Sequence, residues 1–207
     1  MKFVILASET LKEELIFNGV SGNVDVSWIK ELVQFKDHLA ADIFCDLLFD
    51  GSDERIKLLE EFSQPVIINS PVRIKGRRPF IRINGWPGFL KGNVIEASCA
   101  DQEKMKAAEN FFSVFNKKIE WLPDETGFVS ARIVAMIINE AYLALGEGVS
   151  TKEEIDIAMK LGTNYPFGPF EWSQRIGLKK IYTVLMELSE RNSKYHPAEF
   201  LQKELSQ

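Results

Sequence analysis

The sequence predicts two domains: an α/β domain with a mostly parallel sheet over residues 1–122, and an all-α domain over residues 123–207. Before Pro123, short apolar runs alternate with helical patterns, which is typical of strand–helix–strand units. After Pro123 no stretch is convincing as a strand, and amphipathic helical patterns follow one another. The change of pattern at Pro123 marks the predicted domain boundary.

The first half contains short apolar runs of the length expected for buried strands. The predicted strands are residues 3–7, 24–28, 43–49, 66–69, 80–84, 94–97 and 118–122. Stretches between them place apolar residues on one helical face, over residues 9–17, 53–62 and 102–115. This alternation favours parallel strands joined by right-handed crossovers.

The second half begins with an apolar-rich helix predicted over residues 128–145 and closed by two glycines, Gly146 and Gly148. Ser150 is the predicted cap of the next helix, with Glu153 completing a capping box. Proline and glycine then punctuate the remaining helices. These are predicted at residues 170–176, at residues 178–190 beyond Gly177, and from Pro197 onward.

The composition excludes several classes of protein. With 207 residues, the chain is long enough to bury a core without disulfides or a metal. Hydrophobic residues make up 45% and charged residues 27%, as in globular proteins. The 25 basic residues are outnumbered by 30 acidic ones, giving a formal charge of -5, so no nucleic-acid partner is expected.

Neither membrane insertion nor secretion is expected from the sequence. No apolar run approaches the ~18 residues that a membrane span requires. The apolar run at residues 3–7 is too short for a signal peptide, so we expect a cytoplasmic protein with no membrane partner. The cysteines, Cys45 and Cys99, provide no disulfide framework or zinc spacing, and Cys45 is predicted to be a core residue.

The second half resembles the C-terminal domain of the 3-hydroxyacyl-CoA dehydrogenases from Gly127 onward. The residues that carry the resemblance are Gly127-Phe128-Val129-Ser130-Ala131-Arg132, Asn139-Glu140-Ala141, Gly148, Ile155-Asp156, Ala158-Met159-Lys160-Leu161-Gly162, Tyr165-Pro166-Phe167-Gly168-Pro169-Phe170-Glu171 and Gly177-Leu178. A weaker resemblance reaches back to Ala41-Asp42-Ile43-Phe44-Cys45-Asp46, Asn69-Ser70 and the segment 80–97.

This resemblance implies a truncated Rossmann-like first domain and a helical domain through which the family forms dimers. The family reaction is the NAD-dependent oxidation of 3-hydroxyacyl-CoA to 3-oxoacyl-CoA in fatty-acid metabolism. The implied partners are therefore an acyl-CoA thioester and a second copy of the chain. The aromatic residues Tyr165, Phe167, Phe170 and Trp172 are interpreted as interface or core residues.

The positions that match the family's catalytic site are Ser70, Asn84 and Glu96. The family uses a His base with a Glu twelve residues later, and here Asn84 stands in place of the His. An amide cannot accept a proton near neutral pH. Ser70 can equally be a turn residue before Pro71, and Glu96 can equally be a solvated carboxylate at a strand end.

Other parts of the family site are also altered. The Asn that follows the family's Gly-Phe-Val-x run is Ala131 here, and the histidines, His38 and His196, are predicted to lie on the surface. Residues 85–89 replace a stretch that lines the acyl pocket in the family. The basic stretch 73–78 can attract CoA phosphates or form a solvated loop.

The cofactor site departs furthest from the family pattern. Dinucleotide folds need Gly-x-Gly-x-x-Gly after the first strand, where backbone amides approach the pyrophosphate. Here Ser8 and Glu9 occupy this turn, and the chain before Ala41 is far shorter than in the family. We therefore expect no NAD cofactor, no metal and a pseudoenzyme. The alternatives are a non-catalytic acyl-CoA-binding module and a dimeric scaffold or regulatory partner.

Overall fold

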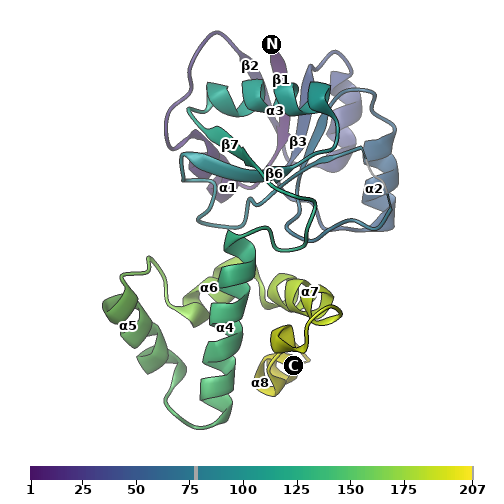
Figure 1. Ribbon diagram of the computed structural model, residues 1–207. Helices are drawn as coiled ribbons and strands as arrows, with labels where there is room; N and C mark the ends of the chain where they lie inside the picture. The colour runs from purple at the N-terminus through teal and green to yellow at the C-terminus, as the bar shows by residue number, and fades with distance from the viewer. Residues whose placement is uncertain (77–78, 207) are drawn as a thin grey trace. The chain divides into compact units, whose positions relative to one another are not determined.

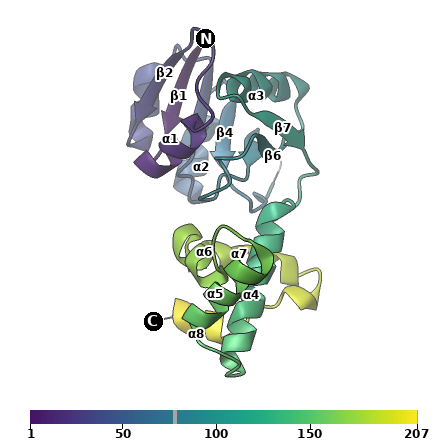
Figure 2. The ribbon, with the colours of Figure 1, turned by 90° about the vertical axis from the view of Figure 1, so that its left-hand side faces the viewer.

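The computed structural model describes residues 1–76 and 79–206 and divides into two compact units, Met1–Phe128 and Val129–Gln207 (Figures 1 and 2). The boundary lies further along the chain than the predicted one at residue 122, because the connecting segment packs on the α/β unit. Asp124 pairs with Arg82 at 2.7 Å, and the Gly127 N–H donates to the Pro71 carbonyl oxygen at 2.8 Å.

The α/β unit is built on a seven-stranded sheet with the order β2-β1-β3-β4-β5-β6-β7. Strands β1 to β5 are parallel, β6 is antiparallel to β5, and β7 is parallel to β6. The strands are β1 (Lys2–Leu6), β2 (Asp25–Ile29), β3 (Ile43–Asp46), β4 (Val66–Asn69), β5 (Ile81–Ile83), β6 (Val94–Ser98) and β7 (Lys118–Trp121). The predicted α/β class with a mostly parallel sheet is confirmed.

Helices cover both faces of this sheet. Helices α1 (Glu9–Ile16) and α3 (Gln102–Val114) share an apolar core with one face. Helix α2 (Asp53–Glu60) and the 3₁₀ helix η1 (Leu32–His38) share a second core with the other face. Cys45, predicted as a core residue, is fully buried in the first core.

The sheet is Rossmann-like but one strand short at its β2 edge. In the usual dinucleotide-binding order 3-2-1-4-5-6, two strands lie beyond the first strand on this side. Here β2 alone lies beyond β1, and η1 leads the chain back to β3. The truncation predicted for residues 1–40 therefore corresponds to the loss of an edge strand.

The second unit is all helical, as predicted. It consists of α4 (Ser130–Gly146), α5 (Lys152–Thr163), α6 (Pro169–Ile176), α7 (Leu178–Ser189), the 3₁₀ helix η2 (Ser193–Tyr195) and α8 (Glu199–Leu205). Helix α4 contacts α6, α7 and α8 and is the centre of the unit (Figure 1). Across the described residues, 1–76 and 79–206, no helix is both long and apolar enough to span a membrane.

The predicted cap of α5 is wrong by one residue. The N-cap is Thr151, whose hydroxyl accepts from the Glu154 N–H at 3.3 Å, and the Glu154 carboxylate accepts from the Thr151 N–H. Ser150 instead donates its hydroxyl to Glu154 at 2.5 Å. Because both residue pairs have the spacing of a capping box, sequence alone does not distinguish them.

A buried carboxylate explains the most specific part of the helical motif. Asp156 on α5 is 8% exposed and accepts from the Phe170 and Glu171 N–H groups at 2.8 and 3.0 Å. These amides are at the start of α6, where a negative charge is favourable. An added Cβ at Gly168 would collide with the Asp156 side chain, so only glycine fits there. Asp156 and Gly168 thus join α5 to α6.

A second polar contact fixes the end of the chain. The Asn139 side chain on α4 donates to the His196 carbonyl oxygen at 3.0 Å and accepts from the Ala198 N–H at 2.8 Å. Asn139 is 2% exposed, so these bonds satisfy a buried amide just before α8. The Asn139-Glu140-Ala141 motif therefore has a structural role within this unit.

Gly168→Ala should destabilise the helical unit by about 1–3 kcal/mol, because the added methyl group forces the Asp156 cap to move. Gly162→Ala is the matched control, because Gly162 lies within α5 and an added Cβ would meet open space there. This substitution should stabilise the helical unit by about 0.5–1 kcal/mol. Urea unfolding followed by circular dichroism measures both. Equal stability of the two variants would contradict the role of Gly168.

Candidate functional site

One face of the β5–β6 pair is polar and the other is apolar. Arg82 lies opposite Ser98 in the antiparallel register, and two residues further along β5 the Asn84 N–H donates to the Glu96 carbonyl oxygen at 3.1 Å. Since side chains alternate along a strand, all these residues project to the same face. On the opposite face, Ile83 and Ala97 belong to the core that contains α3.

The twelve-residue spacing between Asn84 and Glu96 is therefore explained by strand pairing. Asn84 Nδ2 donates to Glu96 Oε2 at 3.5 Å, and Asn84 Oδ1 accepts from the Trp86 N–H at 3.3 Å. Both ends of the Asn84 carboxamide are held by these contacts. Asn84 is placed to orient a polar group, but it has no basic site for a proton.

Ser70 follows β4 and lies beside the end of β5. Its N–H donates to the Ile83 carbonyl oxygen at 3.1 Å, and its hydroxyl donates to the Val72 carbonyl oxygen at 2.7 Å. Ser70 therefore closes a local turn, and the hydroxyl oxygen retains acceptor capacity. The structure places Ser70, Asn84 and Glu96 on the adjacent strands β4, β5 and β6 or at their ends.

Asn69 positions this cluster, a role that the sequence did not reveal. Its Nδ2 donates to the carbonyl oxygens of Leu47 and Gly85 at 3.1 and 2.9 Å, and its Oδ1 accepts from the Gly85 N–H at 2.8 Å. These bonds join the ends of β3, β4 and β5. A Cβ at Gly85 would lie 3.0 Å from the Asn69 side chain, so glycine allows this close approach.

The segment after β5 is packed into the α/β unit. Trp86 is 2% exposed, and both carboxylate oxygens of Glu14 on α1 accept from the Gly88 N–H at 2.9 Å. Lys117 Nζ donates to the Gly92 carbonyl oxygen at 3.0 Å. Burial lowers the pKa of Lys117, and the Glu14 carboxylate opposes that shift. The segment that replaces the family's acyl-pocket stretch thus carries a buried tryptophan.

His38 supplies no replacement base beside Asn84, and the other residues singled out in the sequence belong to the helical unit. His38 lies in η1, which packs on β1 and β2, at the opposite side of the sheet from β5 and β6. His196 is exposed in the helical unit, and Ala131 is a buried apolar residue of α4. Phe170 and Trp172 are core residues, and Tyr165 packs on Trp172 with ring centroids 5.5 Å apart.

The turn between β1 and α1 does not fit a dinucleotide pyrophosphate. The Ser8 hydroxyl accepts from the Leu11 N–H at 3.3 Å and so occupies one amide at the helix start. Glu9, with a 72% exposed side chain, adds a negative charge there and pairs with Lys12 at 3.2 Å. The close approach of phosphates to bare backbone that NAD requires is therefore obstructed.

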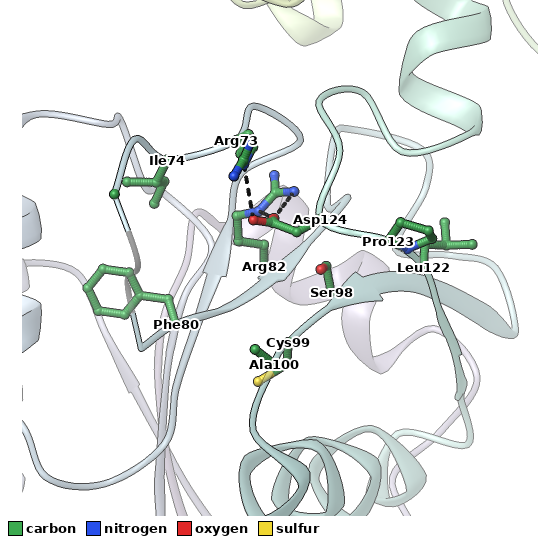
Figure 3. Close-up of a pocket in the computed structure, with 11 residues that line it drawn as sticks. Arg73, Ile74, Phe80, Arg82, Ser98, Cys99, Ala100, Leu122, Pro123 and Asp124 are labelled. Atoms are coloured by element: carbon green, nitrogen blue, oxygen red, sulfur yellow. Dashed lines mark hydrogen bonds and ion pairs between the residues drawn. The ribbon is translucent and has the colours of Figure 1, made fainter.

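The structure describes only part of the predicted basic stretch 73–78. Arg77 and Arg78 lie outside the described residues. Arg73 pairs with Asp124 at 3.3 Å and lines a cavity beside β5, β6 and β7 (Figure 3). In residues 1–76 and 79–206, no three His, Cys, Asp or Glu side chains are grouped as a metal site would require.

Comparison with known proteins gives a consistent set of similarities. Residues 127–207 match the family described as 3-hydroxyacyl-CoA dehydrogenase, C-terminal domain. A 3-hydroxyadipyl-CoA dehydrogenase of Escherichia coli is 34% identical over 130 residues, which are 62% of this chain and 27% of that protein. A probable 3-hydroxybutyryl-CoA dehydrogenase of Bacillus subtilis is 42% identical over 139 residues, 66% of this chain and 47% of that protein.

The similarity to solved structures extends over the whole fold. The crystal structure of (S)-3-hydroxybutyryl-CoA dehydrogenase from Ralstonia eutropha has a TM-score of 0.74 at 21% identity, with 99% of this chain and 93% of that chain covered. At that identity the likeness shows the fold. The stretch matched in the two curated relatives spans between about a quarter and a half of their length.

Proposed function

We propose that this chain is a relative of the 3-hydroxyacyl-CoA dehydrogenases of fatty-acid metabolism that has lost most or all of their oxidation reaction. Its similarity to that family's C-terminal domain covers residues 127–207. The observation that carries the proposal is the contact between Asn84 and Glu96 at 3.5 Å. An amide stands opposite the carboxylate where a base is needed.

The chemical argument concerns a proton. Oxidation of a 3-hydroxyacyl group removes a hydroxyl proton as hydride leaves the adjacent carbon, so a base must take that proton. Asn84 can only hydrogen-bond, and the two histidines lie away from the β5–β6 face or in the helical unit. Loss of a general base typically lowers the rate by about 10²–10⁴-fold.

The cofactor argument is independent of the base. Ser8 and Glu9 obstruct the pyrophosphate turn, and the sheet lacks the strand that normally lies outside β2. We therefore propose that NAD is not a working cofactor of this chain. The reaction then loses both its proton acceptor and its hydride acceptor.

Purified protein should reduce acetoacetyl-CoA with NADH at least about 100-fold more slowly than an ordinary enzyme rate. Asn84→His restores a base opposite Glu96 and should give no substantial gain, because the pyrophosphate turn is unchanged. NADH absorbance measures both proteins. Ordinary turnover by the unaltered chain would overturn the proposal, and strong rescue by Asn84→His would overturn its cofactor half.

Binding of an acyl-CoA thioester is the function that the remaining site supports. Asn84 and Glu96 hold an amide and a carboxylate in contact, and Ser70 provides a hydroxyl just after the neighbouring strand β4. These groups can recognise a polar acyl oxygen without transferring a proton.

Calorimetric titration with acetoacetyl-CoA should give saturable heat, weakened by about tenfold in Asn84→Ala because a hydrogen-bonding group is lost. Asn93→Ala, an exposed residue just before β6, serves as the matched control and should bind as the unaltered chain does. Absence of heat at millimolar ligand would exclude the binding function.

A dimeric scaffold is the second candidate, favoured by apolar residues on the surface of the helical unit. Leu161 and Ile157, one turn apart on α5, are 84% and 53% exposed. Apolar residues grouped in this way are typical of protein interfaces. We propose that a second copy of the chain covers this surface of α5.

Light scattering after size-exclusion chromatography should give the mass of a dimer, and Leu161→Glu should give a monomer because a charge cannot be buried unpaired at an interface. Thr183→Glu changes an exposed position on α7 and should leave the dimer intact. A strict monomer for the unaltered chain would contradict this candidate.

A further inference from the structure

The cavity beside β5, β6 and β7 has a volume of about 610 Å³. Phe80 lies on one side of it and Leu122 on the other, and Ser98 and Cys99 lie between them at the end of β6 (Figure 3). This volume is in the range of small-molecule sites, about 300–1,000 Å³. We call it the β5–β7 cavity.

One of the two arginines in the β5–β7 cavity is structural. Arg82 donates through Nε and Nη2 to Asp124 at 2.9 and 2.7 Å, through Nη1 to the carbonyl oxygens of Ser70 and Pro71, and through Nη2 to that of Glu125. All five guanidinium donors are thus used within the protein. Arg82 holds the connecting segment in place and leaves no donor for a ligand.

The other arginine lining the cavity retains donors. Arg73 Nε donates to Asp124 at 3.3 Å, whereas its two terminal amino groups have no partner among the residues that the structure describes. Asp124 is the cavity's one acidic side chain among the described lining residues, so two guanidinium groups face a single carboxylate. The excess charge is positive, and the guanidinium geometry suits a carboxylate head group.

A hydroxyl in the cavity wall offers a second polar group to a ligand. Ser98 lines the cavity, and within residues 1–76 and 79–206 no protein group is hydrogen-bonded to its hydroxyl. Its oxygen is not among the fully buried side-chain atoms that lack a partner, so the hydroxyl is accessible from the cavity. A ligand with an oxygen at this position would satisfy the Ser98 hydroxyl.

The surroundings disfavour a phosphate as the head group. The start of α3 lies just after the cavity residues, but Asp101 caps it by accepting from the Glu103 and Lys104 N–H groups at 2.9 and 3.2 Å. Its carboxylate occupies amides that could otherwise bind a phosphate. Phe80 and Leu122 give the cavity apolar walls, which favour a ligand with an apolar body.

We propose that the β5–β7 cavity binds a carboxylic acid with an apolar body, its carboxylate on Arg73 and Ser98 and its body between Phe80 and Leu122. The site goes beyond the proposed function. It uses neither Asn84 nor Glu96, and it requires no thioester or nucleotide.

Octanoate is the probe, and Cys99 provides a local readout. Cys99 is half-buried in the cavity wall and Cys45 is fully buried, so alkylation of the native protein reports on Cys99. Burial raises the pKa of the Cys99 thiol, so labelling with iodoacetamide is done at alkaline pH. Octanoate should give saturable calorimetric heat and slow the alkylation of Cys99 over the same concentration range.

Matched variants and ligands identify the head-group contacts. Arg73→Gln should raise the Kd for octanoate about tenfold or more, and Ser98→Ala should raise it several-fold. Lys36→Gln removes another exposed cation with one carboxylate partner, Glu61 at 3.0 Å, and should leave the Kd unchanged. 1-Octanol, which has the same body without the charge, should bind at least about tenfold more weakly.

Several results would overturn the inference: no heat with octanoate, equal binding of 1-octanol, an unchanged Kd in Arg73→Gln, or no protection of Cys99. Ala100→Phe places a ring at an exposed lining position and should abolish binding without unfolding the chain, as circular dichroism checks. Asn84→His should leave octanoate binding unchanged, which separates failure of this site from failure of the proposed function.

Discussion

The antiparallel pairing of β5 with β6 is the constraint on which the candidate site depends. It brings Asn84 to Glu96 and, two residues away on the same face, Arg82 to Ser98. Since the other face of both strands is buried against α3, a shift of one residue would move the apolar side chains out of the core. Core packing therefore fixes the geometry of the polar face, whatever chemistry that face performs.

The sequence predicted the strands, because apolar patterns are local features, whereas the Asn84–Glu96 pair was implied by the resemblance to the family. It did not predict the roles of Asn69, Glu14 or Asp124. The bonding partners of these residues lie far away along the chain, and nothing in a residue's own neighbourhood indicates them. The Thr151 cap was missed for another reason, since two adjacent pairs satisfied the same rule.

The best match to the family lies in the unit whose motif residues have packing roles. Asp156 and Gly168 join two helices, and Asn139 holds the segment before α8. A chain can keep all these contacts while its α/β unit changes. Similarity over residues 127–207 is thus evidence of shared architecture, and the chemistry has to be judged from the β5–β6 face.

The shortened sheet also leaves β2 as an edge strand. Strand β2 pairs with β1 on one side, and its other side is the margin of the sheet. Such a margin offers backbone donors and acceptors to any extended chain nearby. Asp25 and Lys30, both exposed, stand at the two ends of this short strand, and charges so placed discourage strand addition. Charged residues thus protect this edge of the sheet against self-association.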